Sequence, residues 1–486
     1  MKKVKKIVLF IATIALTACN YSSKEDNSSN FGETGADGFV GNEKYTDYGE
    51  NPFILTAEQP VSTFSIDADG ASYANVRRFL NQGQMPPKEA VRIEELVNYF
   101  TFNCAEPQTG ENVSIETEIS SCPWNTQHHL LRIGIKGKTL DINALPASNY
   151  VFLIDVSGSM NSSDKLGILK AGFKAMTEHL TDNDRIAIVT YAGSAGVVLQ
   201  STAGNNKDII RQAIDRLEAG GSTAGAAGIN TAYEIAQQNF IEGGNNRIIL
   251  GTDGDFNVGI SSNKELIKLI EEKRDKGIYL TVLGVGTGNL NDSMMEQIAD
   301  HGDGNYEYID NADEIQKVFV NEKLKLYTVA KDCKNQITFN PSMVVSYRLI
   351  GYENRAMKNE DFEKDTVDAG DLGSSQTVTA VYELMLTDAT VAQPYGTFEF
   401  RYKMPDETSS RLISKSIENG KQFIESASEN QRFAAAVTAF GLILKQSEFK
   451  GEANKQMVRD LAANAVTFDP YGYRAKFLEL LEKISD

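Results

Sequence analysis

A carboxylate and two hydroxyls occupy alternate positions in the segment Asp155-Val156-Ser157-Gly158-Ser159. They directly follow the apolar run Tyr150-Val151-Phe152-Leu153-Ile154, which indicates a buried parallel strand. Because ligands of open α/β sheets bind beyond the carboxyl ends of the strands, these side chains fall where a site is expected. Such oxygen donors suit Mg²⁺ and suit zinc or copper poorly. The same residue types also form turns and helix caps, so this segment alone leaves both interpretations open.

Two further segments favour the metal site. The Gly-rich turn Gly220-Gly221-Ser222-Thr223-Ala224-Gly225 lies between two helical patterns and offers the hydroxyl of Thr223. A second buried-strand pattern, Arg247-Ile248-Ile249-Leu250-Gly251, ends in Thr252-Asp253-Gly254-Asp255. The chain therefore supplies Asp-x-Ser-x-Ser, then a Thr, then an Asp, each from a loop after or near a strand.

This set of residues resembles the von Willebrand factor type A domain and its metal-ion-dependent adhesion site. The resemblance implies one bound divalent cation, Mg²⁺ or else Mn²⁺ or Ca²⁺, held directly or through water by Asp155, Ser157, Ser159, Thr223 and Asp253. Two carboxylates balance the charge of the ion, while neutral hydroxyls leave it a strong electrophile. Since Mg²⁺ prefers six oxygens, one position is expected to stay open for an acidic side chain of a protein partner. The resemblance implies binding and no catalytic residues.

Strand and helix patterns alternate over residues 148–322. The expected strands are 149–155, 185–191, 196–200, 246–251, 278–285 and 305–309. The expected helices are about 164–180, 207–218, 225–239, 263–276, 291–300 and 311–322. Such alternation predicts an α/β, Rossmann-like fold, in which helices cover both faces of a parallel sheet. We call this segment the A domain.

The segments that flank the A domain have other patterns. Residues 112–147 and 324–405 are rich in strand signals, which predicts one discontinuous β-sandwich into which the A domain is inserted. Residues 61–104 are predicted to form an N-terminal helical piece, and residues 425–486 are predicted to form a C-terminal helical region. With Phe433-Ala434-Ala435-Ala436-Val437 and Asp469-Pro470-Tyr471-Gly472-Tyr473-Arg474, nearly the whole chain resembles the bacterial lipoprotein family typified by YfbK.

The N-terminus carries an export signal. Four lysines precede the apolar run Ile7 to Leu16, which is typical of a signal peptide over residues 1–18. Leu16-Thr17-Ala18-Cys19 resembles the bacterial lipobox, which implies that Cys19 is lipidated. Residues 19–60, rich in Ser, Asn, Gly, Asp and Glu, predict a flexible tether. Because Asn20 is not Asp, we expect a lipid anchor in the outer membrane of the cell envelope, facing either the periplasm or the surface.

Composition limits the other possibilities. A chain of 486 residues predicts two to four units, and the net charge of −18 argues against nucleic acid as a partner. Nothing after residue 19 reaches the length of a membrane-spanning apolar run. Cys104, Cys122 and Cys333 allow at most one disulfide within the chain, and the sequence does not choose the pair. The Gly-rich turn 284–288 is a weak nucleotide signature, because Asn289 replaces the third Gly.

The leading hypothesis is a membrane-anchored lipoprotein that binds a protein partner, as an adhesin or scaffold, through a divalent cation. A metal-dependent hydrolase is one alternative. Against it, the second acid of a haloacid-dehalogenase-type phosphatase is Ser157 here, and no Gly-x-Ser-x-Gly elbow or phosphate-binding Gly-x-x-x-x-Gly-Lys loop occurs. The other alternative is a structural envelope protein whose metal site stays unoccupied.

Overall fold

The computed structural model describes residues 42–66, 69–221, 225–254, 263–388, 393–418 and 420–484. The A domain contains a six-stranded sheet in the order β10-β9-β8-β5-β6-β7. Its strands are β5 (Ser148–Asp155), β6 (Arg185–Tyr191), β7 (Ala195–Ala203), β8 (Asn245–Thr252), β9 (Ile278–Val285) and β10 (Tyr306–Ile309). The predicted α/β class is therefore confirmed, and the strand bounds lie within a few residues of those expected from sequence.

The direction of one strand differs from the sequence expectation. β7 runs antiparallel to β6, while the other neighbouring strands are parallel. Only residues 192–194 connect β6 to β7. Such a short connection can only form a hairpin, because a parallel crossover needs a dozen or more residues. The predicted parallel sheet therefore carries one antiparallel strand at this edge.

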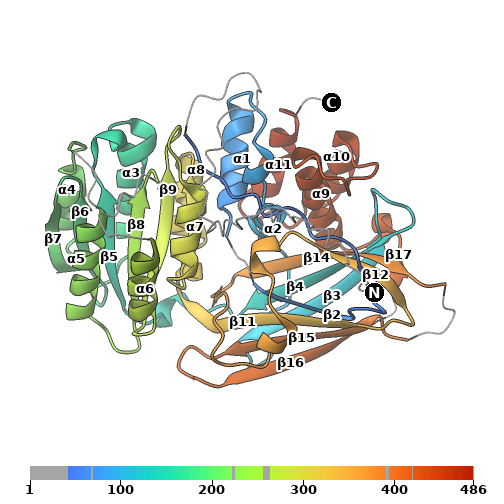
Figure 1. The fold of residues 1–486 in the computed structure, drawn as a ribbon. Coiled ribbons are helices and arrows are strands. Elements are labelled where there is room, and N and C mark those ends of the chain that lie inside the picture. The colour runs from blue at the N-terminus through green and yellow to red at the C-terminus, as the bar shows by residue number, and fades with distance from the viewer. Residues whose placement is uncertain are drawn as a thin grey trace, which may run out of the picture. The chain divides into compact units, whose positions relative to one another are not determined.

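Helices cover both faces of this sheet (Figure 1). One face packs against α5 (Gly225–Gln238), α6 (Asn263–Arg274) and α7 (Asp292–Asp300). The opposite face packs against α3 (Ile168–Thr177), α4 (Lys207–Asp215) and α8 (Ala312–Gln316). Because the strands are buried on both faces, β5 and β8 contain only buried residues, as their continuous apolar patterns predict.

A β-sandwich flanks the A domain in sequence. One sheet has the order β1-β12-β14-β4-β3-β17, with β1 (Ile54–Leu55), β12 (Val344–Ile350), β14 (Thr377–Leu386), β4 (His129–Gly137), β3 (Val113–Ser121) and β17 (Lys421–Gln422). The other contains β13 (Leu372–Gly373), β11 (Thr328–Phe339), β15 (Gly396–Lys403) and β16 (Ser410–Ile417), and β2 (Val61–Ser65) pairs with β11. The two sheets share one apolar core. The chain leaves the sandwich after β4 and returns at β11, which confirms the predicted insertion of the A domain.

Two boundaries drawn from sequence need correction. The sequence places residues 61–65 in the N-terminal helical piece, but they form β2 and pair with residues 334–338 of β11. The expected tether, residues 19–60, is also too long, because residues 42–60 pack on the fold. Glu43 binds Arg78 in a buried ion pair of 2.8 Å, and Lys44 N–H donates to the Leu290 carbonyl. The polar composition of this segment concealed these specific contacts.

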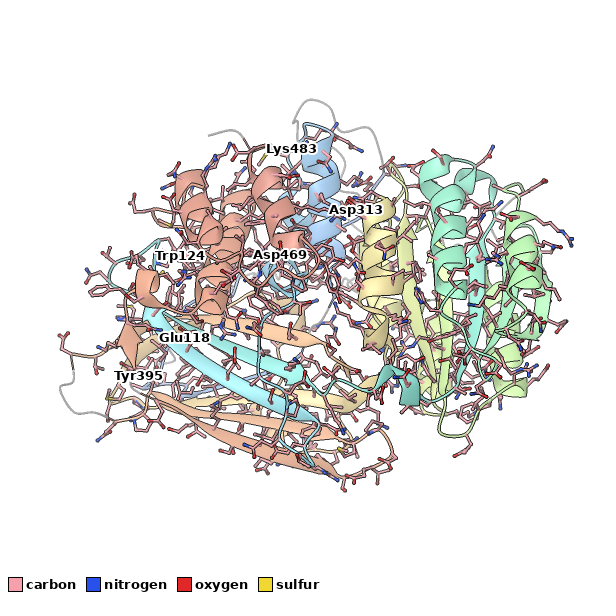
Figure 2. All side chains as sticks on the ribbon, turned by 180° about the vertical axis from the view of Figure 1, so that it is seen from behind. Glu118, Trp124, Asp313, Tyr395, Asp469 and Lys483 are labelled. Atoms are coloured by element: carbon pink, nitrogen blue, oxygen red, sulfur yellow. The ribbon has the colours of Figure 1, made fainter. Side chains whose placement is uncertain are left out.

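The N-terminal and C-terminal helices share one hydrophobic core. It joins α1 (Ala71–Asn81) and α2 (Ile93–Asn98) to α9 (Glu429–Leu444), α10 (Lys455–Ala463) and α11 (Tyr473–Leu481). Trp124, in the turn between β3 and β4, is 1 % exposed and packs into the same core (Figure 2). We call these five helices the helical layer. Periodicity placed its two parts at opposite ends of the chain and could not show that they pack together.

Cys104, Cys122 and Cys333 are buried free thiols. Burial is the main cause that raises the pKa of Cys104 to about 12, so its thiol stays protonated at neutral pH. Each helix within the described ranges is too short or too polar to cross a bilayer.

Candidate metal centre

The two carboxylates predicted as metal ligands lie at adjacent strand ends. Asp155 is the last residue of β5, and Asp253 directly follows β8. These strands are parallel neighbours, with Ile154 opposite Gly251. The chain runs outward from β5 to β6 and β7 on one side, and from β8 to β9 and β10 on the other. The junction of β5 and β8 is therefore the topological switch point, where α/β sheets bind their ligands.

Asp155 is fully buried and is held by hydrogen bonds from three residues. The Ser157 backbone N–H donates to its Oδ1 at 2.8 Å. The hydroxyls of Tyr191 and Thr252 each donate to its Oδ2 at 3.3 Å. Tyr191 ends β6 and Thr252 ends β8, so neighbouring strands fix the orientation of the carboxylate. These two residues were not predicted, because their role depends on strand order.

The predicted serine ligands form the rim of the site. The Oγ atoms of Ser157 and Ser159 are 3.0 Å apart. Ser157 is buried and Ser159 is exposed, so the hydroxyls extend from the buried carboxylates towards solvent. Gly158 N–H donates to the Gly221 carbonyl at 3.0 Å, which holds this loop against the Gly-rich turn. Thr223, the remaining predicted ligand, lies outside the described residues, as does Cys19.

Electrostatics distinguish the two carboxylates. Burial raises the pKa of Asp155 to about 6. The charge of Asp253 raises this pKa further, whereas hydrogen bonds from Ser157 lower it. Burial also opposes ionisation of Asp253, but hydrogen bonds from Lys165 and Asn289, the Lys165 charge and a hydrogen bond from Ser159 lower its pKa. Asp155 is thus a buried acid near a second acid, and a bound cation would stabilise its ionised form.

Lys165 and Asn289 also belong to the site, although no motif in the sequence indicates it. Lys165 Nζ donates to Asp253 Oδ2 and to Asn289 Oδ1, both at 3.0 Å. Lys165 lies in a π-helical turn, Ser163–Gly167, that directly precedes α3. A cation is unfavourable in the first turn of a helix, because the dipole there is positive. The positive charge of Lys165 at this position is the sequence signal that could have indicated an acidic side chain as its partner.

The residues present fit a divalent cation of the Mg²⁺ type. Two carboxylates and two hydroxyls converge on one rim, and all are hard oxygen donors. Within the described ranges, no three His, Cys, Asp or Glu side chains are arranged to hold a metal ion. At this site the two hydroxyls complete the donor set of Asp155, Ser157, Ser159 and Asp253.

Comparison with known proteins assigns the family. Family models match at residues 40–132 (von Willebrand factor), 149–321 (von Willebrand factor type A domain) and 324–486 (Uncharacterized protein YfbK, C-terminal). Uncharacterized protein YfbK of Escherichia coli (strain K12) is 43% identical over 468 residues, covering 91% of this chain and 81% of the relative. The chain belongs to the YfbK family. The YfbK match brings no function with it, because that relative is itself described as uncharacterized.

Other similarities to this YfbK-family chain are more distant. A UPF0353 protein of Mycobacterium sp. (strain KMS) is 26% identical over 219 residues, covering 40% of this chain and 64% of that protein. The solved structure of a von Willebrand factor type A protein from Catenulispora acidiphila is 16% identical, with a TM-score of 0.45, and covers 78% of this chain and 92% of that chain. This structural likeness is too low to support an argument about function.

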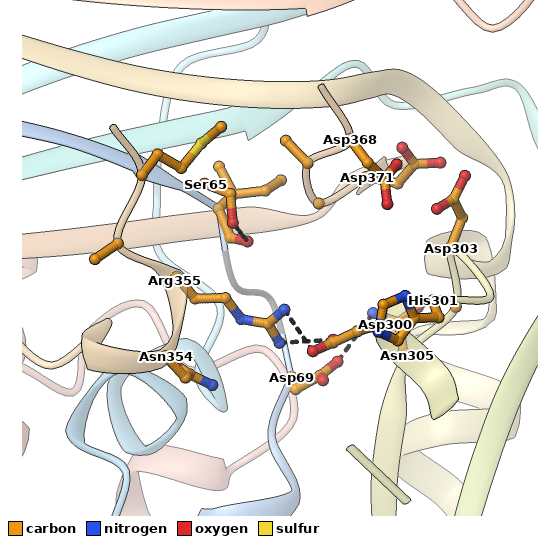
Figure 3. A pocket seen from close by; sticks show the side chains of 16 residues that line it. Ser65, Asp69, Asp300, His301, Asp303, Asn305, Asn354, Arg355, Asp368 and Asp371 are labelled. Atoms are coloured by element: carbon orange, nitrogen blue, oxygen red, sulfur yellow. Dashed lines mark hydrogen bonds and ion pairs between the residues drawn. The ribbon is translucent and has the colours of Figure 1, made fainter. Parts of the chain in front are cut away.

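A second polar feature of this chain is an acidic pocket of about 290 Å³ (Figure 3). Asp303, after α7, lies beside Asp368 and Asp371, which precede β13. Burial and neighbouring acids raise the pKa of Asp371 to about 8. Burial also raises that of Asp368 to about 6, while Arg274, whose Nη1 is 2.6 Å from Asp368, opposes the rise. The carboxyl group of Asp371 therefore retains its proton at neutral pH, burial likewise raises the pKa of Asp303, and Asp368 is mostly ionised.

Proposed function

We propose that this protein binds an acidic segment of a protein partner through a divalent cation held at Asp155, Ser157, Ser159 and Asp253. The observation that carries the proposal is the convergence of two carboxylates and two hydroxyls at the switch point between β5 and β8. Thr223 joins this set by its resemblance to the adhesion-site motif. Mg²⁺, or Mn²⁺ or Ca²⁺, supplies a Lewis-acidic centre with a coordination position open to an outside oxygen.

The chemistry around the site supports binding over catalysis. All four His side chains lie elsewhere in the fold: His128 pairs with Glu383, His129 begins β4, and His179 and His301 lie beyond the far ends of α3 and α7. Lys165, the basic group at the site, is already bound to Asp253 and Asn289. Asp155 is fully buried behind the serines, so its carboxylate is poorly placed to attack a substrate.

The overall charge sharpens the prediction for the partner. The chain carries a net charge of −18, so an acidic partner is repelled at long range. Attraction must then come from the ion, through a direct metal–carboxylate bond. Salt screens exposed charges more than a buried contact, so chelation should weaken binding more than added salt does.

The place of action is the second part of the proposal. The signal sequence over residues 1–18 and the lipobox-like Leu16-Thr17-Ala18-Cys19 support lipid attachment in the bacterial envelope. Asn20 favours the outer membrane over the inner membrane. The protein then acts as a tethered adhesin or scaffold that presents the A domain to partners in the envelope or outside the cell.

Affinity capture from envelope extract tests the proposal. The exported part of the chain is immobilised and compared with Asp155→Ala, in buffers containing Mg²⁺, EDTA, or Mg²⁺ with added salt. Ser163→Ala is the matched control, because Ser163 is exposed beside the site and contributes no predicted ligand. We expect a partner that is retained by wild type and control in Mg²⁺ and is lost in EDTA and in Asp155→Ala.

Amide replacement of the partner's acidic residues then locates the contact. One such change should remove the metal-dependent binding. Retention that is unaffected by EDTA and by Asp155→Ala would overturn the proposed mechanism while leaving the fold unchanged.

A further inference from the structure

Lys165 is built into the metal centre. Its side chain is 11 % exposed, although lysine normally extends into solvent, and its partner Asp253 is fully buried. The ammonium bridges two loops, because Asp253 follows β8 and Asn289 follows β9. Both contacts are 3.0 Å long. A largely buried lysine side chain that bridges two loops is held in a fixed position, in contrast to a mobile ion pair on the surface.

The backbone also makes room for this lysine. Gly286, in the Gly-rich turn after β9, has a φ of 76°, a conformation that favours glycine. A Cβ at Gly286 would lie 2.3 Å from Cε and 2.5 Å from Cγ of Lys165. The lysine stem therefore lies directly on the turn, in the space left by the missing side chain. This gives the Gly-rich turn a local role that needs no bound nucleotide.

We propose that Lys165 is a resident cation that competes with the divalent ion for Asp253. This inference rests on the proposed function and concerns how the same site is regulated. The Lys165 ammonium occupies Oδ2 of Asp253, a carboxylate that the proposed function assigns to the metal. A divalent ion on that carboxylate would lie within a few ångströms of the ammonium, where two positive charges in a buried environment repel strongly. The metal and the ammonium are therefore alternative partners of Asp253.

Competition of this kind sets a threshold for the metal. Without the divalent ion, Lys165 compensates the buried charge of Asp253, so the metal-free domain stays folded. With the ion bound, the ammonium leaves Asp253 and its bridge to Asn289 is broken. The site then binds the divalent ion only above a certain metal concentration, and the protein binds its acidic partner only under those conditions.

Calorimetric titration with Mg²⁺ tests the competition on the exported part of the chain. Lys165→Met keeps the length of the stem and removes the charge, so it should bind Mg²⁺ at least ten-fold more tightly than wild type. Lys174→Met is the matched control, because Lys174 lies on α3 in an exposed pair with Asp215, and its affinity should equal that of wild type. Equal or weaker affinity in Lys165→Met overturns the competition even when wild type binds the ion.

A second measurement needs no variant that might fail to fold. Acetic anhydride labels free amines, and mass spectrometry reports the rate of labelling at each lysine. In wild type, Lys165 should be protected without metal and should react several-fold faster with saturating Mg²⁺, while the rate at Lys174 stays constant. Unchanged protection of Lys165 in Mg²⁺ would contradict the competition.

The two measurements also separate this inference from the proposed function. Mg²⁺ binding by wild type with no change in Lys165→Met or in labelling would reject the inference alone. Binding by Lys165→Met but not by wild type would support the inference and reject metal-dependent function in the natural protein. Absence of binding in both, with Lys165 protected throughout, would reject both proposals.

Discussion

Arg92 and Asp292 form a buried ion pair that joins the helical layer to the A domain. Arg92 immediately precedes α2, and Asp292 is the first residue of α7. Arg92 Nη1 lies 2.5 Å from Asp292 Oδ2, and the side chains are 5 % and 1 % exposed. Because α7 begins just after Asn289, this pair fixes the helix that follows one loop of the metal centre. Tyr306 also donates to Asp292, at 3.0 Å.

We predict that Arg92→Met lowers the free energy of unfolding by about 3–5 kcal/mol, because it leaves the Asp292 charge buried without its partner. Urea unfolding checks this. The transition is monitored by the fluorescence of the single tryptophan, Trp124, which lies in the same core as α2. Arg92→Met combined with Asp292→Leu should cost less than the sum of the single changes. Lys174→Met, at an exposed pair, should leave the unfolding midpoint unchanged. A midpoint of Arg92→Met equal to wild type would refute the role given to this pair.

The metal donors should contribute unequally. Asp155→Ala and Asp253→Ala each remove a charged ligand, so calorimetry with Mg²⁺ should detect no binding. Ser157→Ala removes one neutral ligand and should weaken binding by about ten-fold, the equivalent of about 1.4 kcal/mol. Thr223→Ala should have a similar effect, because the adhesion-site motif assigns one neutral hydroxyl to Thr223. Circular dichroism should stay unchanged, since these residues lie beyond the strand ends. Wild-type affinity in either Asp variant would remove the site as assigned.

The acidic pocket predicts a pH dependence of stability. The folded-state pKa of Asp371 is raised to about 8, mainly by burial, while an unfolded Asp has a pKa near 3.9. The folded state therefore holds a proton that the unfolded chain has released, so the contribution is fully present below about pH 4. It is lost as the pH rises through 8. Asp371→Asn mimics the protonated carboxyl and should be more stable than wild type above pH 8, by at least about 1 kcal/mol.

Urea unfolding between pH 5 and pH 9 measures this difference, which should shrink towards acidic pH. Asp365→Asn is the control within the same segment. A hydrogen bond from Ser410 is the main cause that lowers the pKa of Asp365, so this variant should not gain stability at high pH. Parallel pH profiles for wild type and Asp371→Asn would show that the Asp371 carboxyl is ionised in the folded state.

The anchor is tested by Cys19→Ser. The variant should leave the membrane fraction and collect with soluble exported protein, because it lacks the lipidated residue. Stable attachment needs more than one acyl chain, and Cys19 is the residue expected to carry them. Nearly all of the variant should therefore be released from the membrane. Ser23→Ala, in the same segment, should fractionate like wild type. Continued membrane retention of Cys19→Ser would disprove the lipoprotein interpretation.

Local sequence determined the A domain and the residues proposed for its metal site. Short apolar runs, such as the five residues Tyr150 to Ile154, specify buried strands, because burial on both faces leaves no polar alternation. Asp155 and Asp253 then lie at or just after the carboxyl ends of two such strands, which is the edge where an α/β sheet binds its ligands. These features depend on residues within a few positions of each other, so the local sequence pattern is enough to predict them.

Tertiary structure alone decided which distant groups meet. Lys165 reaches Asp253 because a π-helical turn before α3 aims its stem across Gly286. Asp303 and Asp371 share one pocket although 68 positions in the printed sequence separate them. The N- and C-terminal helices bury each other's apolar faces in the helical layer. The hydrophobic effect and charge pairing have no sequence period of their own, so an amphipathic helix or a single lysine does not specify its partner until the chain has packed.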